Sequence, residues 1–343
     1  MLGRVLRGKK EDGLMNIPPR SSSKRSAMFL LVFGVCMVSY SGPMVKGALL
    51  AGATPVAIAL VRMASAGLIL LPSLARAITK NRLPSAINPG QWLWVTLAAL
   101  FLAGHYMTWI TSLTGTSTFA SVALVCTQPL FVAFFSYLLF GETIPQKALP
   151  GAILALAGAA LIALSGSAGD GNSLSPDSAG SPGQGLTSNL LALSGAVLMA
   201  AHWLTARHVR GSLPAQVYTP VLYLITALIL ACSLPLMGSF SMPLAALPYM
   251  AGLVLGSTLL GHAMLSRTLS QVSAGVVSFA LLAEPVGAMV FAMIIFHEIP
   301  SSGVLAGGGL TLLGLSLYLS CESRRRRIKQ EGTLSAHSEG EPS

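Results

Sequence analysis

The residues of this chain that could do chemistry are few, and the first of them is an acid inside an apolar block. Ten of the eleven acidic residues lie in the tails, in a linker or near the ends of apolar blocks, whereas Glu284 stands near the centre of one. If that block spans a membrane, an isolated charge at its centre costs about 2.5 kcal/mol or more. We therefore expect Glu284 to face a water-filled cavity or to gain and lose a proton. The alternative is a neutral Glu284 that bonds a carbonyl freed by Pro285 and only stabilises the bundle.

A second polar residue stands before a proline in the first half of the chain. Gln128 precedes Pro129 as Glu284 precedes Pro285. A proline lacks the N–H that the preceding turn would bond, so we expect each helix to break about one turn earlier. Backbone carbonyls freed inside a membrane are tolerated only against protein or a water-filled cavity. The two pairs therefore predict the polar floor of one central site.

An arginine and two aromatic residues complete the candidates. Arg62 lies about seven residues into an apolar block, either as a counter-charge for a substrate carboxylate or another helix, or as a cation that snorkels to the surface and anchors the block. His105 and Trp109 are four residues apart, which places them on one face of a helix with Tyr106 beside them. We expect this face to line the outer half of a cavity.

The composition excludes several classes of protein. Of the 343 residues 53% are hydrophobic and 9% are charged, against about 25% charged in a soluble domain, and the mean hydropathy is +0.71. A soluble enzyme is therefore excluded. The net charge is +10. The lysines and arginines that produce it lie between apolar blocks and at the chain ends, without interleaved aromatic residues, so no nucleic acid is expected as a partner. Isolated cysteines and histidines indicate no metal and no other cofactor. His202 and His262, near block ends, are expected to be interfacial anchors.

Ten apolar blocks approach the roughly 20 residues that a membrane span needs. With the amino end in the cytoplasm, Lys46 and Arg62 alone, among the 21 basic residues, lie outside the inner loops and the two tails. The positive-inside rule thus places both termini in the cytoplasm, with the basic tails near anionic membrane lipid. We predict an all-α polytopic membrane protein with spans at 27–46, 55–75, 91–112, 118–140, 148–165, 187–206, 216–237, 245–265, 273–296 and 302–320.

The two halves of the chain repeat each other, because several short patterns recur in the same order. Gly104-His105 recurs as Gly261-His262, Gln128-Pro129 as Glu284-Pro285, Glu142 as Glu298, and Gly151 and Gly158 as Gly307 and Gly314. Each half holds five spans, and an odd number makes the second half enter the bilayer from the opposite side. We predict two inverted five-helix repeats. Their bounds are 27–165 and 187–320, between a basic tail at 1–26 and a second tail at 321–343, with a flexible Gly/Ser/Pro-rich outer linker at 166–186.

Glycines crowd the fifth and tenth spans, and Gly303 and Gly307 stand at GxxxG spacing. Such small faces let two helices approach closely. They could join two protomers of a homodimer, or they could close each repeat.

With these features the sequence resembles the drug/metabolite transporter superfamily, in particular its bacterial members with two EamA-type domains. The resemblance extends from about Ala27 to Ser320 and rests on Lys46 at the end of the first span, PVAIALVR at 55–62, TSTFASVALVCTQPLFVAFFSYLLFGE and SAGVVSFALLAEPVGAMVFAMIIFHE. It implies a ten-helix transporter whose central cavity is lined by Gln128-Pro129, Glu284-Pro285, His105 and Trp109. It also implies that the helix-end acids Glu142 and Glu298 are structural. The acid at 284 departs from the family pattern, so the resemblance implies no proton role.

We therefore expect a secondary transporter of the bacterial cytoplasmic membrane that exports amino acids or related small metabolites by alternating access. Proton coupling through Glu284 is a hypothesis. Nucleosides or drugs are the alternative cargoes, and the chain offers too few intramembrane cations to favour phosphate-bearing ones. An intramembrane enzyme would need a paired nucleophile and base or paired acids, which the spans lack. A passive channel would conduct without saturation.

Overall fold

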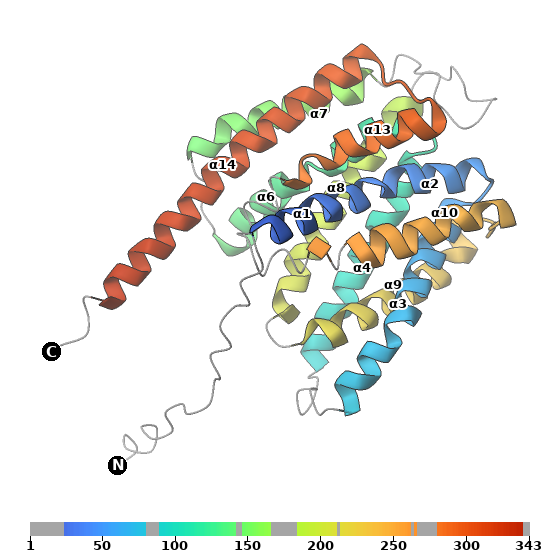
Figure 1. Cartoon of the computed structure of the whole chain (residues 1–343), viewed down its shortest axis with the longest axis horizontal. Coiled ribbons are helices and arrows are strands. Elements are labelled where there is room, and N and C mark those ends of the chain that lie inside the picture. The colour runs from blue at the N-terminus through green and yellow to red at the C-terminus, as the bar shows by residue number, and fades with distance from the viewer. Residues whose placement is uncertain are drawn as a thin grey trace.

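Apolar segments become helices throughout the part of the chain that the structure describes (Figure 1). This computed structural model describes residues 24–79, 89–141, 146–165, 184–210, 213–261, 264–265 and 280–338, and no strand occurs within these ranges. Helices satisfy their own backbone hydrogen bonds, which a lipid environment requires. The chain is therefore all-helical over the described residues, as the sequence predicts.

The described part of the first half contains seven helices and a short turn. They are α1 (Lys24–Ser39), α2 (Ser41–Leu50), α3 (Pro55–Thr79), α4 (Pro89–Ser112), α5 (Thr118–Val125), α6 (Gln128–Phe140), the 3₁₀ turn η1 (Gln146–Ala148) and α7 (Leu149–Ser165).

The described part of the second half contains one irregular helix. It contains α8 (Gln184–Arg210), α9 (Ala215–Met237), the 3₁₀ turn η4 (Leu244–Ala246), α10 (Leu247–Ala251), the π-helix η5 (Gly252–Gly261), α13 (Glu284–Phe296) and α14 (Ser302–Ser338).

Eight helical segments of the described chain are long and apolar enough to cross a membrane, and two apolar helices are shorter. The shorter ones, Gln146–Ile162 and Glu284–Phe296, correspond to the fifth and ninth predicted spans. Residues 273–279 of the ninth span lie outside the described residues, as do residues 166–183 of the predicted linker. The two-repeat chain is thus consistent with ten helices.

The last helix is longer than the sequence analysis predicts. We expect the tenth span to end at residue 320, but α14 continues without a break to Ser338 (Figure 1). No proline interrupts residues 321–338, and most of them are compatible with a helix. The first part of the predicted carboxy-terminal tail is therefore helical.

Several of the predicted spans are interrupted helices. The first breaks at Tyr40, between α1 and α2, and the fourth breaks between α5 and α6, where residues 126–127 form a turn. Pro43, Pro129 and Pro285 each stand in the first turn of the segment that follows a break. Because proline carries no N–H, the carbonyl four residues before it has no helical partner. The break next to Pro43 is one that the sequence analysis does not predict.

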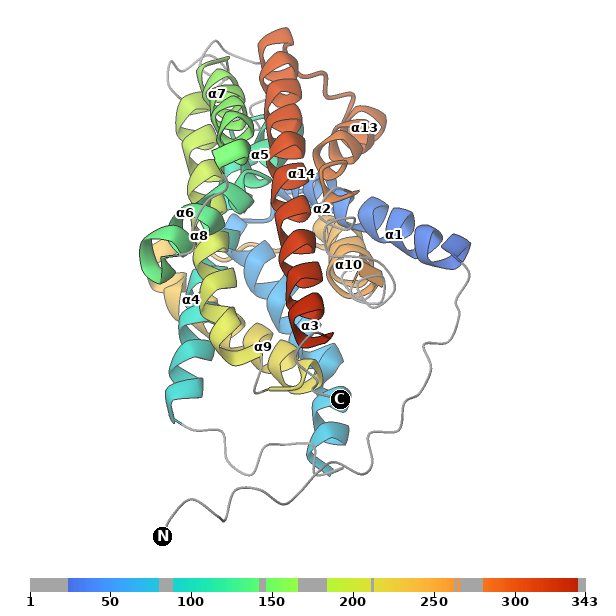
Figure 2. The same cartoon turned by 90° about the vertical axis from the view of Figure 1, so that its left-hand side faces the viewer.

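The fifth and tenth spans pack against each other through glycines. A Cβ added to Gly158 would lie 2.6 Å from the Gly307 carbonyl oxygen, and one added to Gly151 would lie 2.7 Å from that of Gly314. These pairings make α7 and α14 antiparallel (Figure 2). Gly151 repeats as Gly307 and Gly158 as Gly314, so each glycine meets the repeat partner of the other, as a two-fold axis between the repeats requires.

The glycine faces therefore join the two repeats within one chain. Gly303 also faces α7, where an added Cβ would meet the Ser165 hydroxyl. The sequence analysis predicts either a homodimer contact or closure of each repeat. Closure of each repeat is wrong, because these glycines pack against the other repeat of the same chain, and the homodimer stays a prediction. Only a close approach of two backbones excludes every side chain larger than glycine at these positions.

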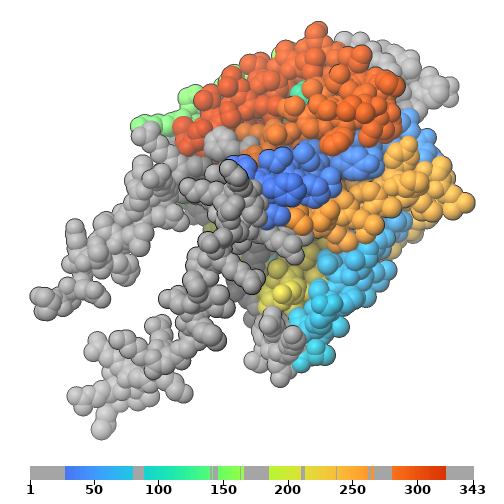
Figure 3. Space-filling model, viewed as in Figure 1, coloured from blue at the N-terminus to red at the C-terminus, as the bar shows by residue number. Residues whose placement is uncertain are grey.

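The remaining helices lie between this pair and a second pair. α7 and α14 form one edge of the bundle and α3 and α9 the opposite edge (Figures 1 and 2). On the face shown in Figure 3, α14, α13, α1 and α10 lie side by side. These helices expose large apolar side chains, among them Phe29, Ile294 and Leu313. Such surfaces are suited to lipid.

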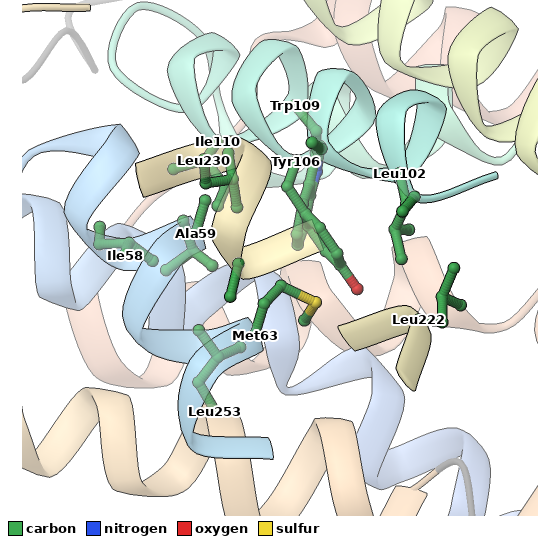
Figure 4. Close-up of a cluster of buried hydrophobic side chains, with 14 of the residues drawn as sticks. Ile58, Ala59, Met63, Leu102, Tyr106, Trp109, Ile110, Leu222, Leu230 and Leu253 are labelled. Atoms are coloured by element: carbon green, nitrogen blue, oxygen red, sulfur yellow. The ribbon is translucent and has the colours of Figure 1, made fainter. Parts of the chain in front are cut away.

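The largest buried cluster joins α3, α4, α9 and η5. Tyr106 and Trp109 project from α4 towards Met63 of α3, with Leu222 and Leu253 close by (Figure 4). The predicted candidates Arg62, His105 and Trp109 belong to the same helices. The packing of α3 against α4 therefore positions them.

Candidate functional site

Arg62 lies inside the bundle, with 3% of its surface exposed. Its guanidinium carbon is 4.7 Å from the ring centre of Tyr106 and 5.8 Å from that of Trp109. Aromatic faces attract cations, and they hold this one where α3 meets α4. The alternative interpretation, that Arg62 snorkels to the surface as an anchor, is therefore wrong.

The guanidinium is bound on one side and has an unused donor on the other. Arg62 Nε donates to Thr258 Oγ1 at 2.9 Å. Its Nη1 is buried and has no hydrogen-bond partner among the described residues, and the same is true of Trp109 Nε1. Buried polar atoms are nearly always bonded, so these two donors point to a ligand. Arginine and indole N–H groups together match the oxygens of a carboxylate.

The π-helix η5 holds the arginine in place. Thr258 Oγ1 donates to the Leu253 carbonyl, five residues earlier, at 2.9 Å, and accepts the bond from Arg62 Nε. Ser257, beside it, has a buried hydroxyl without a partner among the described residues. Neither residue is a candidate from the sequence, because hydropathy and spacing do not distinguish a π-helix from an α-helix. π-helical turns often occur at functional sites.

Replacing Thr258 by valine tests this positioning. Thr258→Val keeps the shape of the side chain and removes the acceptor for Arg62 Nε, so the guanidinium loses its fixed orientation. We expect the KM for the compound that binds there to rise about tenfold or more, since one hydrogen bond to a charged group is worth about 1.5 kcal/mol or more. Thr205→Val is the control, because the Thr205 hydroxyl bonds only carbonyls of its own helix. An unchanged KM in Thr258→Val would contradict this role.

His105 and His202 bind α4 and α8 to each other. His105 Nδ1 is 2.9 Å from the Gly195 carbonyl oxygen, and His202 Nδ1 is 2.8 Å from that of Ala98. Each carbonyl stands seven residues before the histidine on its own helix, so the two bonds are reciprocal across the antiparallel pair. The prediction of His202 as an interfacial anchor is wrong, since it is buried and bonds a neighbouring helix. His262 lies outside the described residues.

His105 also belongs to the aromatic surroundings of the arginine. Its ring lies nearly parallel to that of Trp109, with 5.9 Å between the ring centres. Because the Gly195 carbonyl can only accept, His105 Nδ1 is the donor and, in the neutral ring, Nε2 is left as an acceptor. His105 therefore joins two helices and stacks on the residue that carries an unused N–H.

The two polar residues that precede prolines occupy equivalent places. Gln128 is the first residue of α6 and Glu284 is the first residue of α13, each followed by its proline. Gln128 Oε1 is buried without a partner among the described residues, and Glu284 is half-buried. Each of the two half-helices that follow the breaks therefore begins with a polar residue.

Electrostatic interactions connect these breaks to the arginine. The positive charge of Arg62 acts on the Glu284 carboxyl group, and Glu284 in turn acts on Cys126, at the end of α5. The structure thus brings Arg62, His105 and Trp109 together, and Glu284 is near enough for the charge of Arg62 to act on it. Within the described ranges no cluster of three or more histidine, cysteine or acidic residues forms.

Comparison with known proteins identifies the family. The model of the EamA-like transporter family matches residues 25–164 and again residues 186–320. The search of curated proteins finds no match. A solved structure whose title reads only "Crystal structure of protein" covers 86% of this chain and 98% of its own, with a TM-score of 0.55 and 16% identity, and so shows a similar fold. The family matches cover both repeats, and the chain therefore belongs to the EamA-like transporters of the drug/metabolite transporter superfamily, which are multi-pass membrane proteins.

Proposed function

We propose that this protein is a secondary transporter of the bacterial cytoplasmic membrane that exports a small zwitterionic carboxylate, such as an amino acid, by alternating access. The observation that carries the proposal is the buried Arg62 guanidinium, whose Nη1 has no partner in the described part of the chain. Membership of the family supports transport as the function, and the arginine indicates which chemical group the cargo carries.

Inverted repeats support alternating access. α7 and α14 run antiparallel and exchange repeat positions at their glycines, as two five-helix units inserted in opposite directions would. The two units also share breaks before Pro129 and Pro285. Inverted repeats with interrupted helices near the midplane can take two related packings, one open to each side of the membrane.

The charge distribution supports one orientation. The positive-inside rule assigns the basic loops and both tails of the sequence to the cytoplasm. The end of the bundle where α2 and α13 finish and α5 begins is then the outer end. Basic residues of the tails would contact anionic lipid.

The surroundings of Arg62 favour a zwitterion over a nucleoside. The guanidinium and the Trp109 N–H offer two donors to a carboxylate, and the rings of Tyr106 and Trp109 offer apolar surface. Glu284, within range of the arginine charge, supplies a carboxyl group that can take up and release a proton. A nucleoside has no carboxylate to use the arginine.

A ligand screen followed by flux measurements tests the proposal. The detergent-purified protein is heated with single amino acids, nucleosides and cationic drugs, since a compound that binds the folded state raises its unfolding temperature. We expect zwitterionic carboxylates to stabilise the protein and the methyl esters of the same compounds to have no effect. Flux of the hits in proteoliposomes should saturate, unlike that of a channel. Equal stabilisation by acid and ester would contradict the carboxylate.

Substituting the membrane acid tests proton coupling. Glu284→Gln keeps the size and hydrogen bonding of the side chain but cannot release a proton. We expect the variant to fold, to bind its ligand within about threefold of the parent affinity, and to lose the dependence of flux on a pH gradient. Gln146→Glu is the control, because an added carboxylate at this exposed residue should change nothing. Proton-driven flux that persists in Glu284→Gln would refute the coupling role.

A further inference from the structure

A buried ion pair lies at the end of the bundle where α2 finishes. Lys46 and Glu298 are 4% and 6% exposed, and Lys46 Nζ is 4.0 Å from Glu298 Oε2. Lys46 Nζ also donates to the Thr116 carbonyl oxygen at 3.3 Å. Removing a single member of a buried pair leaves the other charge uncompensated, which is strongly unfavourable. Loss of either Lys46 or Glu298 would therefore destabilise the helix packing in which the pair is buried.

The same carboxylate caps a third helix. Glu298 accepts hydrogen bonds from the backbone N–H of Thr118 and, at 2.8 Å, from its hydroxyl. Thr118 is the first residue of α5, where the partial positive charge of the helix favours an anion. Glu298 thus connects the segment after α13 to the start of α5 and to the end of α2.

These three helices are the half-helices that lie between the breaks and this end. α2 starts after the break at Tyr40, α5 ends at the break before Gln128, and α13 starts at Glu284. They touch at Gly42, where an added Cβ would be 3.0 Å from Thr118 and 3.9 Å from Ala288. Between the polar residues of the breaks and this end of the bundle, the chain is therefore closely packed.

The second half of the sequence does not repeat every residue of this ion pair and its helix cap. The repeat equates Glu298 with Glu142, which lies outside the described residues, and Thr118 with Ala274 or Gly275, which have no hydroxyl. The stretch equivalent to Lys46 is His-Trp-Leu-Thr-Ala at 202–206, and Arg207 follows it directly. The combination of a lysine, an acid and a threonine hydroxyl at the end where α2 finishes is thus not repeated residue by residue in the second half.

We propose that the Lys46–Glu298 pair is a lock on the outer end of the protein, which makes the outward-closed packing the resting state. The inference rests on the proposed function for its orientation and its two packings. Opening outward separates α2, α5 and α13, and so breaks the pair and removes the cap of α5. Water then hydrates both charges, whereas the inward-open packing keeps them together.

The lock has a distinct signature in single and double variants. Lys46→Met leaves Glu298 buried without its cation, and Glu298→Gln leaves Lys46 without its anion, so each disfavours the closed packing. The double variant, Lys46→Met with Glu298→Gln, buries no charge at this site. We expect its outer end to be closed, as in the parent. Thr118→Val removes one bond to the carboxylate and should have a smaller effect in the same direction.

Labelling of a reporter cysteine from outside measures opening. The four native cysteines are changed to serine, and Ser41→Cys places a thiol at the start of α2, where the hydroxyl is buried. The charged methanethiosulfonate reagent MTSET is added to intact cells. We expect each single variant to react about tenfold faster than the parent, and the double variant to react within about threefold of it. Lys147→Met, which removes an exposed lysine in η1, should react at the parent rate.

The outcomes separate the lock from the proposed function, because labelling needs no cargo. Unchanged or slower reaction in both single variants overturns the lock, as does a double variant that stays as fast as the singles. If Lys46→Met does not reach the membrane, Glu298→Gln and Thr118→Val decide in the same way. Failure of every compound in the ligand screen would contradict the cargo and leave a positive labelling result intact.

Discussion

Arg62→Met is expected to reduce transport about a hundredfold or more while leaving the protein at least as stable as the parent. The substitution removes the cation that we assign to the cargo carboxylate, and loss of one partner of a buried charge pair costs about 2–5 kcal/mol of binding. In the absence of cargo the same cation is buried with an unused donor, so its removal should not lower the unfolding temperature. The measurements are flux into proteoliposomes and thermal unfolding, each with and without the best ligand of the screen.

Two further variants distinguish the role of the guanidinium from that of charge alone. Arg62→Lys keeps the charge but cannot bond Thr258 through Nε and also present Nη1, so we expect it to remain severely impaired. Arg76→Met, at the exposed end of the same helix, should transport within about twofold of the parent. Parent-like flux in Arg62→Met would remove the basis of the carboxylate assignment.

Gly158→Val should destabilise the protein strongly, because it forces apart the two helices that join the repeats. An added Cβ at Gly158 would lie 2.5 Å from the backbone nitrogen of Thr311 and 2.6 Å from the Gly307 carbonyl oxygen. Backbone atoms of a packed helix cannot turn aside as a flexible side chain can, so α7 and α14 must separate. Overpacking of this kind typically costs about 1–3 kcal/mol, and valine should lie at or above the upper end.

A glycine on the partner helix provides the matched control. Gly309 of α14 is exposed, and a Cβ there would meet nothing within 4 Å. Gly309→Val should therefore unfold within about 2 °C of the parent, because it adds a methyl-bearing side chain without a clash. Thermal unfolding and size-exclusion profiles in detergent measure both variants. Equal behaviour of the two would show that the contact between α7 and α14 does not hold the repeats together.

The prolines show how far local sequence reasoning reaches. Pro129 and Pro285 predict helix breaks about a turn earlier, and in the structure α5 ends at Val125 and α13 begins at Glu284. A missing N–H acts on its own turn, so the sequence suffices to predict its effect. Pro43 follows the same rule, but it lies near the end of an apolar block, where no polar neighbour or repeat partner marks it as important.

The arginine shows where such reasoning stops. From its position Arg62 could anchor a helix at the surface or face the interior, and the difference depends on which way α3 turns relative to α4 and η5. The π-helix that presents Thr258 and the bond between His202 and α4 likewise depend on contacts between residues far apart in the chain. Neither hydropathy nor spacing contains that information.

By itself the sequence determined that this protein is helical, membrane-embedded and repeated, and where its helices break. These properties arise from burial of apolar residues and from backbone chemistry within a few turns. The tertiary structure alone decided which glycines meet, that Arg62 stacks on Tyr106 and Trp109, and that Lys46 meets Glu298. Those contacts depend on the rotation and register of packed helices, which side-chain fit across the whole bundle sets.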